Sequence, residues 1–329
     1  MKKTLIYVAV LLLLCVLAYV FVFKGDSSPF GSDETNFTVK DTAAITTIFL
    51  SNPQGQKVKL SRGPKEWTLN DSMVARKDAV EFLLQAMHDQ KPEQPVSMSY
   101  HDAVVTDMSV NNTKVELYSG DKNTHTFYVG RNPGTNNCTY MLKEGAKRPY
   151  IVKLPLQNTF VGVRYFCSVS DWRERRILYG YSDIEQIKLE YKDSVQYSFT
   201  LDVKPEGKTV TGSGQMDQPL NLKRVDSYLG FWESIYCTGY ENSNFLKDSI
   251  LKHGRQLATI NIKRKESKPQ TLTLYFRPPD KGTKAILKID GESYDFDTFF
   301  GWLNHHDFIL ISRKNAEKML RSYPEFFQQ

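Results

Sequence analysis

Two adjacent histidines and an aspartate, His305-His306-Asp307, form the most concentrated set of metal-ligand side chains in the sequence. Imidazole nitrogens and carboxylates are ligands that zinc and other divalent metals accept. Adjacent side chains diverge, however, and no third strong ligand stands beside them at motif spacing. We therefore predict a turn here, between a helix at 299–303 and a strand at 308–311, and we expect neither a resident metal nor a cofactor.

A second acidic group, Asp290-Gly291-Glu292 with Asp295 and Asp297, could attract calcium through its carboxylates. It lacks the alternating oxygen ligands and the glycine position of a calcium-binding loop. Asp-Gly is instead typical of the tight turn in a β-hairpin. The segment therefore predicts a hairpin turn between two strands.

The sequence contains no motif that nominates catalysis or nucleotide binding. It has no phosphate-binding G-x-x-x-x-G-K-[ST], no G-x-G-x-x-G after a strand and no H-E-x-x-H. Gly212-Ser213-Gly214 is too short for a nucleophile elbow. A triad based on Ser or Cys stays open, since its members converge in space rather than in sequence. We favour a non-enzymatic role and leave the question of an enzyme open.

The densest basic and aromatic cluster consists of Trp172, Arg173, Arg175 and Arg176. Such a cluster could bind an acidic partner or lipid headgroups. The alternative is an exposed helix whose tryptophan packs between the two halves of the protein while the arginines pair with Glu174 or Asp171. We carry these four residues as candidate partner-binding residues.

A second candidate partner site is the aromatic run that contains Phe299, Phe300 and Trp302. The spacing of these aromatic residues indicates a helix, and most aromatic residues at such spacing belong to the core. The run lies in a segment with no counterpart earlier in the chain. Insertions of this kind often carry binding functions, so we predict a partner site here.

Residues 4–23 are uncharged, and a helix of that length spans a bilayer. The run is too long and its end too bulky for a cleaved signal, although cleavage or lipidation at Cys15 remains an alternative. Lys2 and Lys3 precede it, which predicts a cytoplasmic N-terminus and a periplasmic body. We therefore predict a single-pass protein of the inner (cytoplasmic) membrane.

The net charge and the cysteines limit the remaining function classes. The formal charge is +6, and half of it comes from Lys2, Lys3 and Lys24 beside the apolar run. The nearly neutral body excludes a dedicated nucleic-acid binder, so we expect no nucleic-acid partner. The body has three cysteines without C-x-x-C spacing, which allows one disulfide at most and favours free thiols.

An internal repeat organises the body. Apolar residues at 80, 83, 84 and 87 form a helical stripe, and residues 225, 228, 229 and 232 repeat it at an offset of 145. Short helices at 100–109 and 245–254 and strands at 114–118 and 259–263 follow at the same offset. Later strands also match, 139–142 with 285–288 and 149–152 with 308–311.

These matches predict an α+β fold of two tandem related halves after an N-terminal transmembrane helix. Each half is a mostly antiparallel sheet with one long and one short helix. The predicted divisions are the anchor 1–24, a tether 25–36, the first half 37–161, a connector 162–183 and the second half 184–329.

Several short strings stand out, namely Phe37-Thr38-Val39-Lys40-Asp41-Thr42, Trp67 with Ala75-Arg76-Lys77-Asp78-Ala79, Thr139-Tyr140-Met141-Leu142, Arg148-Pro149-Tyr150-Ile151-Val152, Arg164-Tyr165-Phe166 and Trp172-Arg173. As a set they resemble a bacterial membrane-anchored family, domain-of-unknown-function family 4340, in its Bacteroidota form. The resemblance implies an envelope protein without an assigned reaction, and some relatives look like companions of an ABC-type export system.

We therefore expect a membrane-anchored, extracytoplasmic interaction or assembly module of the bacterial envelope. Its expected partners are the inner membrane, through residues 4–23, and an envelope or transporter protein. Two alternatives stay open. One is an envelope hydrolase acting on glycan or peptide, and the other is a periplasmic protein that binds a small ligand.

Overall fold

The computed structural model describes residues 34–132, 138–155, 157, 159–214 and 216–328. The chain divides into two compact units, Met1–Val169 and Ser170–Gln329, which we call unit 1 and unit 2. No helix in the described ranges is long and apolar enough to cross a membrane. The predicted membrane span at 4–23 lies outside those ranges.

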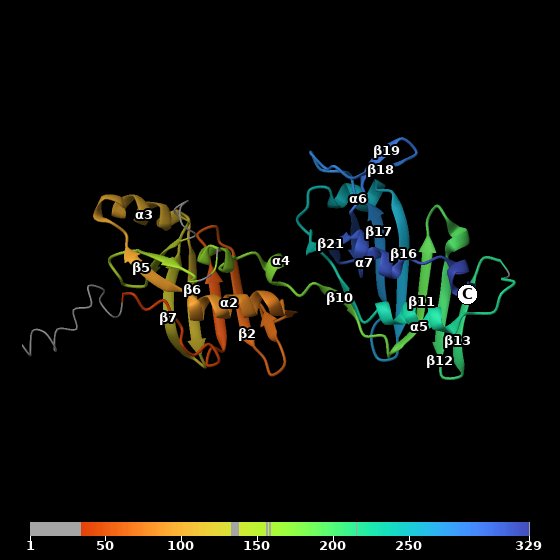
Figure 1. Ribbon diagram of the computed structural model, residues 1–329, viewed down its shortest axis with the longest axis horizontal. Coiled ribbons are helices and arrows are strands. Elements are labelled where there is room, and N and C mark those ends of the chain that lie inside the picture. Colours follow the sequence, from red (N-terminus) through yellow and green to blue (C-terminus); the bar gives the residue numbers. More distant parts are fainter. Residues whose placement is uncertain (1–33, 133–137, 156, 158, 215, 329) are drawn as a thin grey trace, which may run out of the picture. The chain divides into compact units, whose positions relative to one another are not determined.

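Unit 1 is built on a nine-stranded antiparallel sheet (Figure 1) with the strand order β4-β3-β2-β1-β6-β7-β8-β9-β5. Its strands are β1 (Thr47–Ser51), β2 (Lys57–Arg62), β3 (Trp67–Leu69), β4 (Met73–Val74), β5 (Lys91–Pro95), β6 (Thr113–Ser119), β7 (Lys122–Val129), β8 (Thr139–Lys143) and β9 (Tyr150–Lys153).

Two helices cover the two faces of this sheet. Helix α2 (Lys77–Asp89) buries Val80, Leu83 and Met87, the stripe that the sequence predicts, and lies across one face (Figure 1). Helix α3 (Met98–Val110) buries Val104 and Met108 against tyrosines and aliphatic residues of the opposite face. The short 3-10 helix η1 (Val161–Arg164) follows the last strand.

Gln90, which follows α2, has a fully buried polar side chain that hydrogen-bonds to two distant segments of unit 1. Its amide nitrogen donates to the Phe37 carbonyl, and its amide oxygen accepts a 2.7 Å hydrogen bond from the Tyr165 hydroxyl. A buried amide needs such partners, because an unsatisfied one costs about 1–3 kcal/mol. Segments near the two ends of the described part of unit 1 therefore meet at one side chain.

Unit 2 contains an eight-stranded antiparallel sheet in the order β13-β12-β11-β16-β17-β20-β21-β15. Two small sheets, β10-β14 and β18-β19, accompany it. The strands are β10 (Arg176–Tyr179), β11 (Ile184–Tyr191), β12 (Phe199–Lys204), β13 (Gly207–Gly212), β14 (Ser234–Tyr236), β15 (Gly239–Tyr240), β16 (Gln256–Arg264), β17 (Gln270–Phe276), β18 (Ile286–Ile289), β19 (Glu292–Asp295), β20 (Thr298–Leu303) and β21 (Asp307–Ser312).

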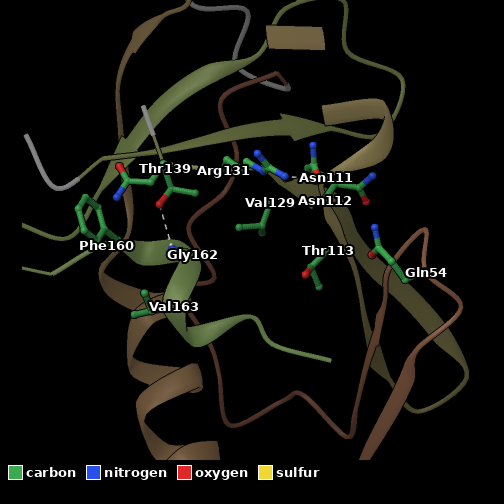
Figure 2. A pocket seen from close by; sticks show the side chains of 12 residues that line it. Gln54, Asn111, Asn112, Thr113, Val129, Arg131, Thr139, Phe160, Gly162 and Val163 are labelled. Carbon is green, nitrogen blue, oxygen red and sulfur yellow. Dashed lines mark hydrogen bonds between the residues drawn. The ribbon is translucent and has the colours of Figure 1, made fainter. Parts of the chain in front are cut away.

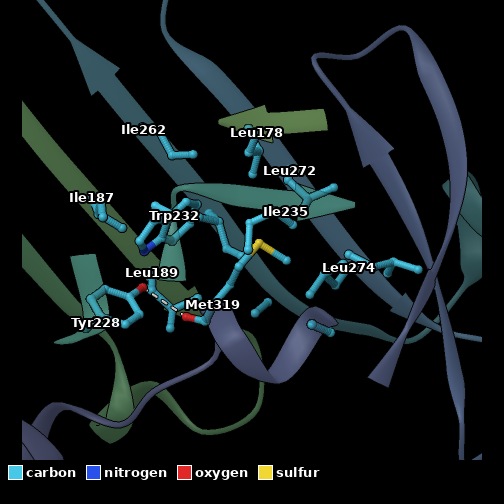
Figure 3. Close-up of a cluster of buried hydrophobic side chains, with 14 of the residues drawn as sticks. Leu178, Ile187, Leu189, Tyr228, Trp232, Ile235, Ile262, Leu272, Leu274 and Met319 are labelled. Atoms are coloured by element: carbon cyan, nitrogen blue, oxygen red, sulfur yellow. Dashed lines mark hydrogen bonds between the residues drawn. The ribbon is translucent and has the colours of Figure 1, made fainter. Parts of the chain in front are cut away.

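The helices of unit 2 also lie on both faces of its sheet. Helices α5 (Leu222–Phe231) and α7 (Arg313–Met319) pack on one face, where the Tyr228 hydroxyl donates a 2.9 Å hydrogen bond to the Met319 carbonyl (Figure 3). Helix α6 (Lys247–His253) packs Ile250 on the other face. The remaining helices are α4 (Val169–Trp172), η2 (Val195–Tyr197) and η3 (Tyr323–Phe327).

The predicted class, mixed α and β with mostly antiparallel sheets, is confirmed. The predicted helix at 299–303 is wrong, because these residues form the inner strand β20. Phe299 packs into the main core and Phe300 into the cluster under α6. A strand that is buried on both faces loses its polar alternation, so its sequence resembles that of a buried helix.

The predicted match of 285–288 with β8 is also wrong. Residues 286–289 form β18, which pairs with β19 in a separate hairpin, and β20 is the strand that lies beside β17. The aromatic run therefore belongs to the eight-stranded sheet of unit 2, whereas the β18–β19 hairpin forms a separate small sheet.

Candidate functional site

The first candidate site is a pocket of about 370 Å³ at one corner of the unit 1 sheet (Figure 2). Antiparallel pairing creates this corner, because it places Thr113 at the start of β6 opposite Val129 at the end of β7. Pairing of Ser51 with Lys114 brings the β1–β2 turn to the same end. We call the pocket the amide corner, and it contains Gln54, Asn111, Asn112, Thr113, Arg131 and Phe160.

One wall of the amide corner is a hydrogen-bonded network around Arg131. The Arg131 Nη2 donates to the Asn111 Oδ1 at 2.6 Å, and the Asn111 Nδ2 donates to the Asp107 Oδ1 at 2.8 Å. The Arg131 Nε also lies 3.9 Å from that carboxylate. The network holds the guanidinium in place and offsets its charge.

Two further amides are held by their nitrogens. The Gln54 Nε2 donates to the Val110 carbonyl at 3.1 Å, and the Asn112 Nδ2 donates to the Met108 carbonyl at 2.7 Å. Among the described residues, neither amide oxygen accepts a hydrogen bond. Each oxygen is thus a fixed acceptor for a molecule that enters the pocket.

The floor and the opposite wall of the amide corner are partly apolar. Figure 2 shows Val129 near the centre, with Phe160 and Val163 on the side of η1. The Gly162 backbone N–H donates to the Thr139 hydroxyl at 2.9 Å, which attaches this segment to β8. The pocket therefore combines hydrogen-bonding groups on one side with an apolar surface on the other.

The second candidate site is a pocket of about 640 Å³ in unit 2. It lies where helix α6 leads into β16 and where β17 ends, next to the residues that follow β11. Its lining includes Asp193, Ser249, His253, Arg255, Glu292 and Tyr294, and we call it the charged corner.

Arg255 connects three segments across the charged corner. Its Nη2 lies 2.9 Å from the Asp193 carboxylate and its Nη1 lies 2.7 Å from that of Asp290. Asp290 stands in the turn of the β18–β19 hairpin, so Arg255 attaches this hairpin to the body of unit 2. On the hairpin itself, the Tyr294 hydroxyl donates to the Glu292 carboxylate.

The predicted cluster at 172–176 is divided between the interior and the surface of unit 2. Trp172 is fully buried. Arg173 donates two hydrogen bonds of 2.7 Å to Asp307 and stacks 3.9 Å above the ring of Tyr240. The cluster is therefore not one continuous binding patch.

The other two arginines of the cluster differ from each other. Arg175 pairs with Asp171 at 3.6 Å, which agrees with the alternative that we kept open. Arg176 lies in β10 with an exposed side chain, and Glu174 accepts a hydrogen bond from its backbone N–H.

Asp307 is the charged group at the centre of this arrangement, with a side chain only 8% exposed. Burial raises the pKa of Asp307, but hydrogen bonds from Arg173 and Asn242 outweigh burial and hold that pKa below its ordinary value. Asp307 therefore serves an ion pair within unit 2.

The predicted turns at 304–306 and 290–291 are both present. His306 contacts Asp307 at 3.2 Å, and the described residues contain no group of three side chains that could hold a metal. In the second aromatic candidate, Phe299 and Phe300 are 2% and 1% exposed. Trp302 is half-buried below the Lys247 ammonium, 5.3 Å from the ring centre.

The amide corner does not coincide with any site that the sequence motifs predict. Its residues come from five separate segments, and only strand register brings them together. One usable signal was present, since Asn111-Asn112 precedes a predicted strand and Gly130-Arg131-Asn132 follows the next one. Consecutive antiparallel strands place such flanking residues side by side.

A family model described as "Domain of unknown function (DUF4340)" matches residues 67–253, which is more than half of the chain. The match includes segments of both units. No match to the chain was found among the curated proteins or among the solved structures.

Proposed function

The chain belongs to the DUF4340 family, and we propose that it is a membrane-anchored, extracytoplasmic interaction module of the bacterial envelope, of the Bacteroidota type. Residues 4–23 carry no charge and follow Lys2 and Lys3, which supports a single span with a cytoplasmic N-terminus. The body then lies in the periplasm, where an envelope protein, such as part of an ABC-type export system, is the proposed partner.

The proposal includes two related halves. In unit 1, Val115 lies between Leu50 and Phe127 on the neighbouring strands, and in unit 2 Ile260 lies between Leu189 and Leu272. Val115 and Ile260 differ by 145 positions, and so do Phe127 and Leu272. Shared register across these strands supports duplication of one unit, with the β18–β19 hairpin added to the second copy.

The observation that carries an interaction role is the chemistry of the amide corner. Its polar groups are amides, hydroxyls and one guanidinium, several of them held in place by hydrogen bonds to the protein. Amides donate and accept hydrogen bonds but do not act as general bases at neutral pH. Such a pocket recognises a polar molecule and holds it unchanged.

The charged corner gives limited support to the hydrolase alternative. Asp193, Glu292, His253 and Ser249 line one pocket, and these are residue types that hydrolysis of a glycan or peptide requires. Asp193 already pairs with Arg255, and Glu292 already accepts a hydrogen bond from Tyr294. Engaged carboxylates of this kind favour a structural role over catalysis.

Crosslinking of the full chain in intact membranes, followed by identification of the captured proteins, tests the interaction role. We expect at least one envelope protein to be captured, and capture of none with crosslinkers of several lengths would contradict the proposal. Topology is tested separately by a reporter that is active only in the cytoplasm. Fused after Gln329, it should be silent.

A further inference from the structure

We propose that the amide corner of unit 1 binds a neutral saccharide. The inference rests on the interaction role proposed above and adds to it the class of the bound molecule. A saccharide presents hydroxyl groups around a ring whose faces carry C–H groups. Recognition therefore needs fixed donors and acceptors on one side of a pocket and an apolar surface on the other.

The polar side of the amide corner matches hydroxyl groups. Each hydroxyl both donates and accepts, so it can donate to the amide oxygens of Gln54 and Asn112 and accept from the Arg131 guanidinium. The amide nitrogens are already bound to the backbone carbonyls of Val110 and Met108. The acceptors are thus in place before a ligand arrives, which lowers the entropic cost of binding.

The charge of the amide corner favours a neutral ligand. Arg131 is the charged residue among those that line the pocket. Its Nε lies 3.9 Å from Asp107, and Asn111 bridges the two side chains by hydrogen bonds. A phosphate or carboxylate would meet the Asp107 charge next to the arginine, and an amine would meet the guanidinium.

The apolar side and the size of the pocket fit a sugar ring. Val129, Phe160 and Val163 supply the apolar surface (Figure 2). Val163 is 53% exposed, so the pocket opens to solvent beside it. The volume of about 370 Å³ lies within the range of about 300–1,000 Å³ that is typical of small-molecule sites.

The position of the pocket distinguishes a saccharide from an extended peptide. Peptides that recognise sheets usually add a strand at an exposed edge. The amide corner lies at the ends of the inner strands β6 and β7, whereas the edge strands are β4 and β5. Strand β5 also contains Pro92 and Pro95, and prolines at an edge discourage pairing with another strand.

The test is a titration of the purified full chain in nanodiscs, followed by saturation-transfer NMR. The probes are the neutral disaccharides maltose, cellobiose and chitobiose, the acidic sugar galacturonate, and the peptide triglycine. Two variants address the site, Gln54→Ala, which removes one acceptor, and Val163→Trp, which fills the opening. The matched controls are Gln85→Ala, an exposed glutamine of α2, and Val195→Trp on an exposed site of unit 2.

We expect at least one neutral disaccharide to bind, and both site variants to weaken its binding by at least about tenfold while both controls leave it unchanged. Three results would overturn the inference: binding of galacturonate or triglycine alone, binding that the site variants do not alter, or no binding of any probe. Crosslinking by the unmodified chain separates the two proposals. Capture of an envelope protein together with no binding of any saccharide probe would refute this inference alone.

Discussion

The amide corner of unit 1 and the charged corner of unit 2 each lie where an inner strand begins and the neighbouring strand ends. In each, a helix leads into an inner strand, α3 into β6 and α6 into β16, and the end of the next strand lies beside it. Their side chains differ. Unit 1 presents amides held by their nitrogens, whereas unit 2 presents an arginine that pairs with two carboxylates and thereby joins three segments.

This difference in side chains suggests different roles for the two corners, attachment of a hairpin in unit 2 and ligand binding in unit 1. In unit 2, Arg255 pairs with Asp193 and with Asp290 of the β18–β19 hairpin, so the polar groups serve the fold. In unit 1, Gln54 and Asn112 line the pocket, and their amide oxygens accept no hydrogen bond from the described residues (Figure 2). We infer that the amide corner of unit 1 binds a ligand, whereas the charged corner of unit 2 attaches the β18–β19 hairpin.

The largest expected effect comes from Arg173→Ala. It leaves Asp307 buried without its ion-pair partner, which costs about 3–5 kcal/mol of unfolding free energy. Arg131→Ala in unit 1 removes an arginine whose side chain is 65% exposed and should cost less than about 1 kcal/mol. Urea titration followed by hydrogen exchange in peptides of each unit measures both values. An equal loss of unfolding free energy in the two variants would contradict the claim that Arg173 serves the fold and Arg131 does not.

Strand and helix patterns could be predicted from the sequence because one buried face imposes a period. Val225, Tyr228, Leu229 and Trp232 are buried as their spacing indicates. The run at 298–303 was predicted wrongly because both of its faces are buried. The pockets were not predicted, since their residues are distant in sequence and meet only through the register of the strands.

The next largest effect concerns acid stability and again belongs to unit 2. The folded pKa of Asp307 lies below its ordinary value of 3.8, so the ion pair stabilises unit 2 above that pH. This contribution is lost as the pH falls through the folded pKa. Hydrogen exchange at decreasing pH should show protection falling in unit 2. Asp307→Asn should flatten that decrease, and an unaltered decrease in this variant would assign the effect to other carboxyl groups.

A local effect is expected from Arg255→Ala, which frees the β18–β19 hairpin from the body of unit 2. Hydrogen exchange should become several-fold faster at 286–295 and stay unchanged in α5 and in unit 1. Lys263→Ala is the matched control, because it removes another ion pair of unit 2 far along β16. Unchanged exchange in the hairpin would show that Arg255 does not brace it.

The smallest effect concerns thiol chemistry. Burial raises the pKa of Cys237 to about 11, and burial also raises the pKa of Cys138 and Cys167 in unit 1. Because the thiolate is the reactive form, all three should react slowly with iodoacetamide at mildly alkaline pH. Mass spectrometry of the labelled peptides measures the labelling rate of each cysteine in the folded protein and in the protein unfolded in urea. Labelling of folded Cys237 as fast as in urea would contradict its burial.

The most direct measurement is methyl NMR of the full chain, with labelled valine and isoleucine, during titration with the disaccharide that binds best. Val129 and Val163 report on the amide corner, and Ile250 reports on the charged corner. The account predicts shifts at the two valines with Ile250 unchanged. Shifts at Ile250 alone, or equal shifts at both corners, would contradict the claim that the amide corner binds the ligand and the charged corner does not.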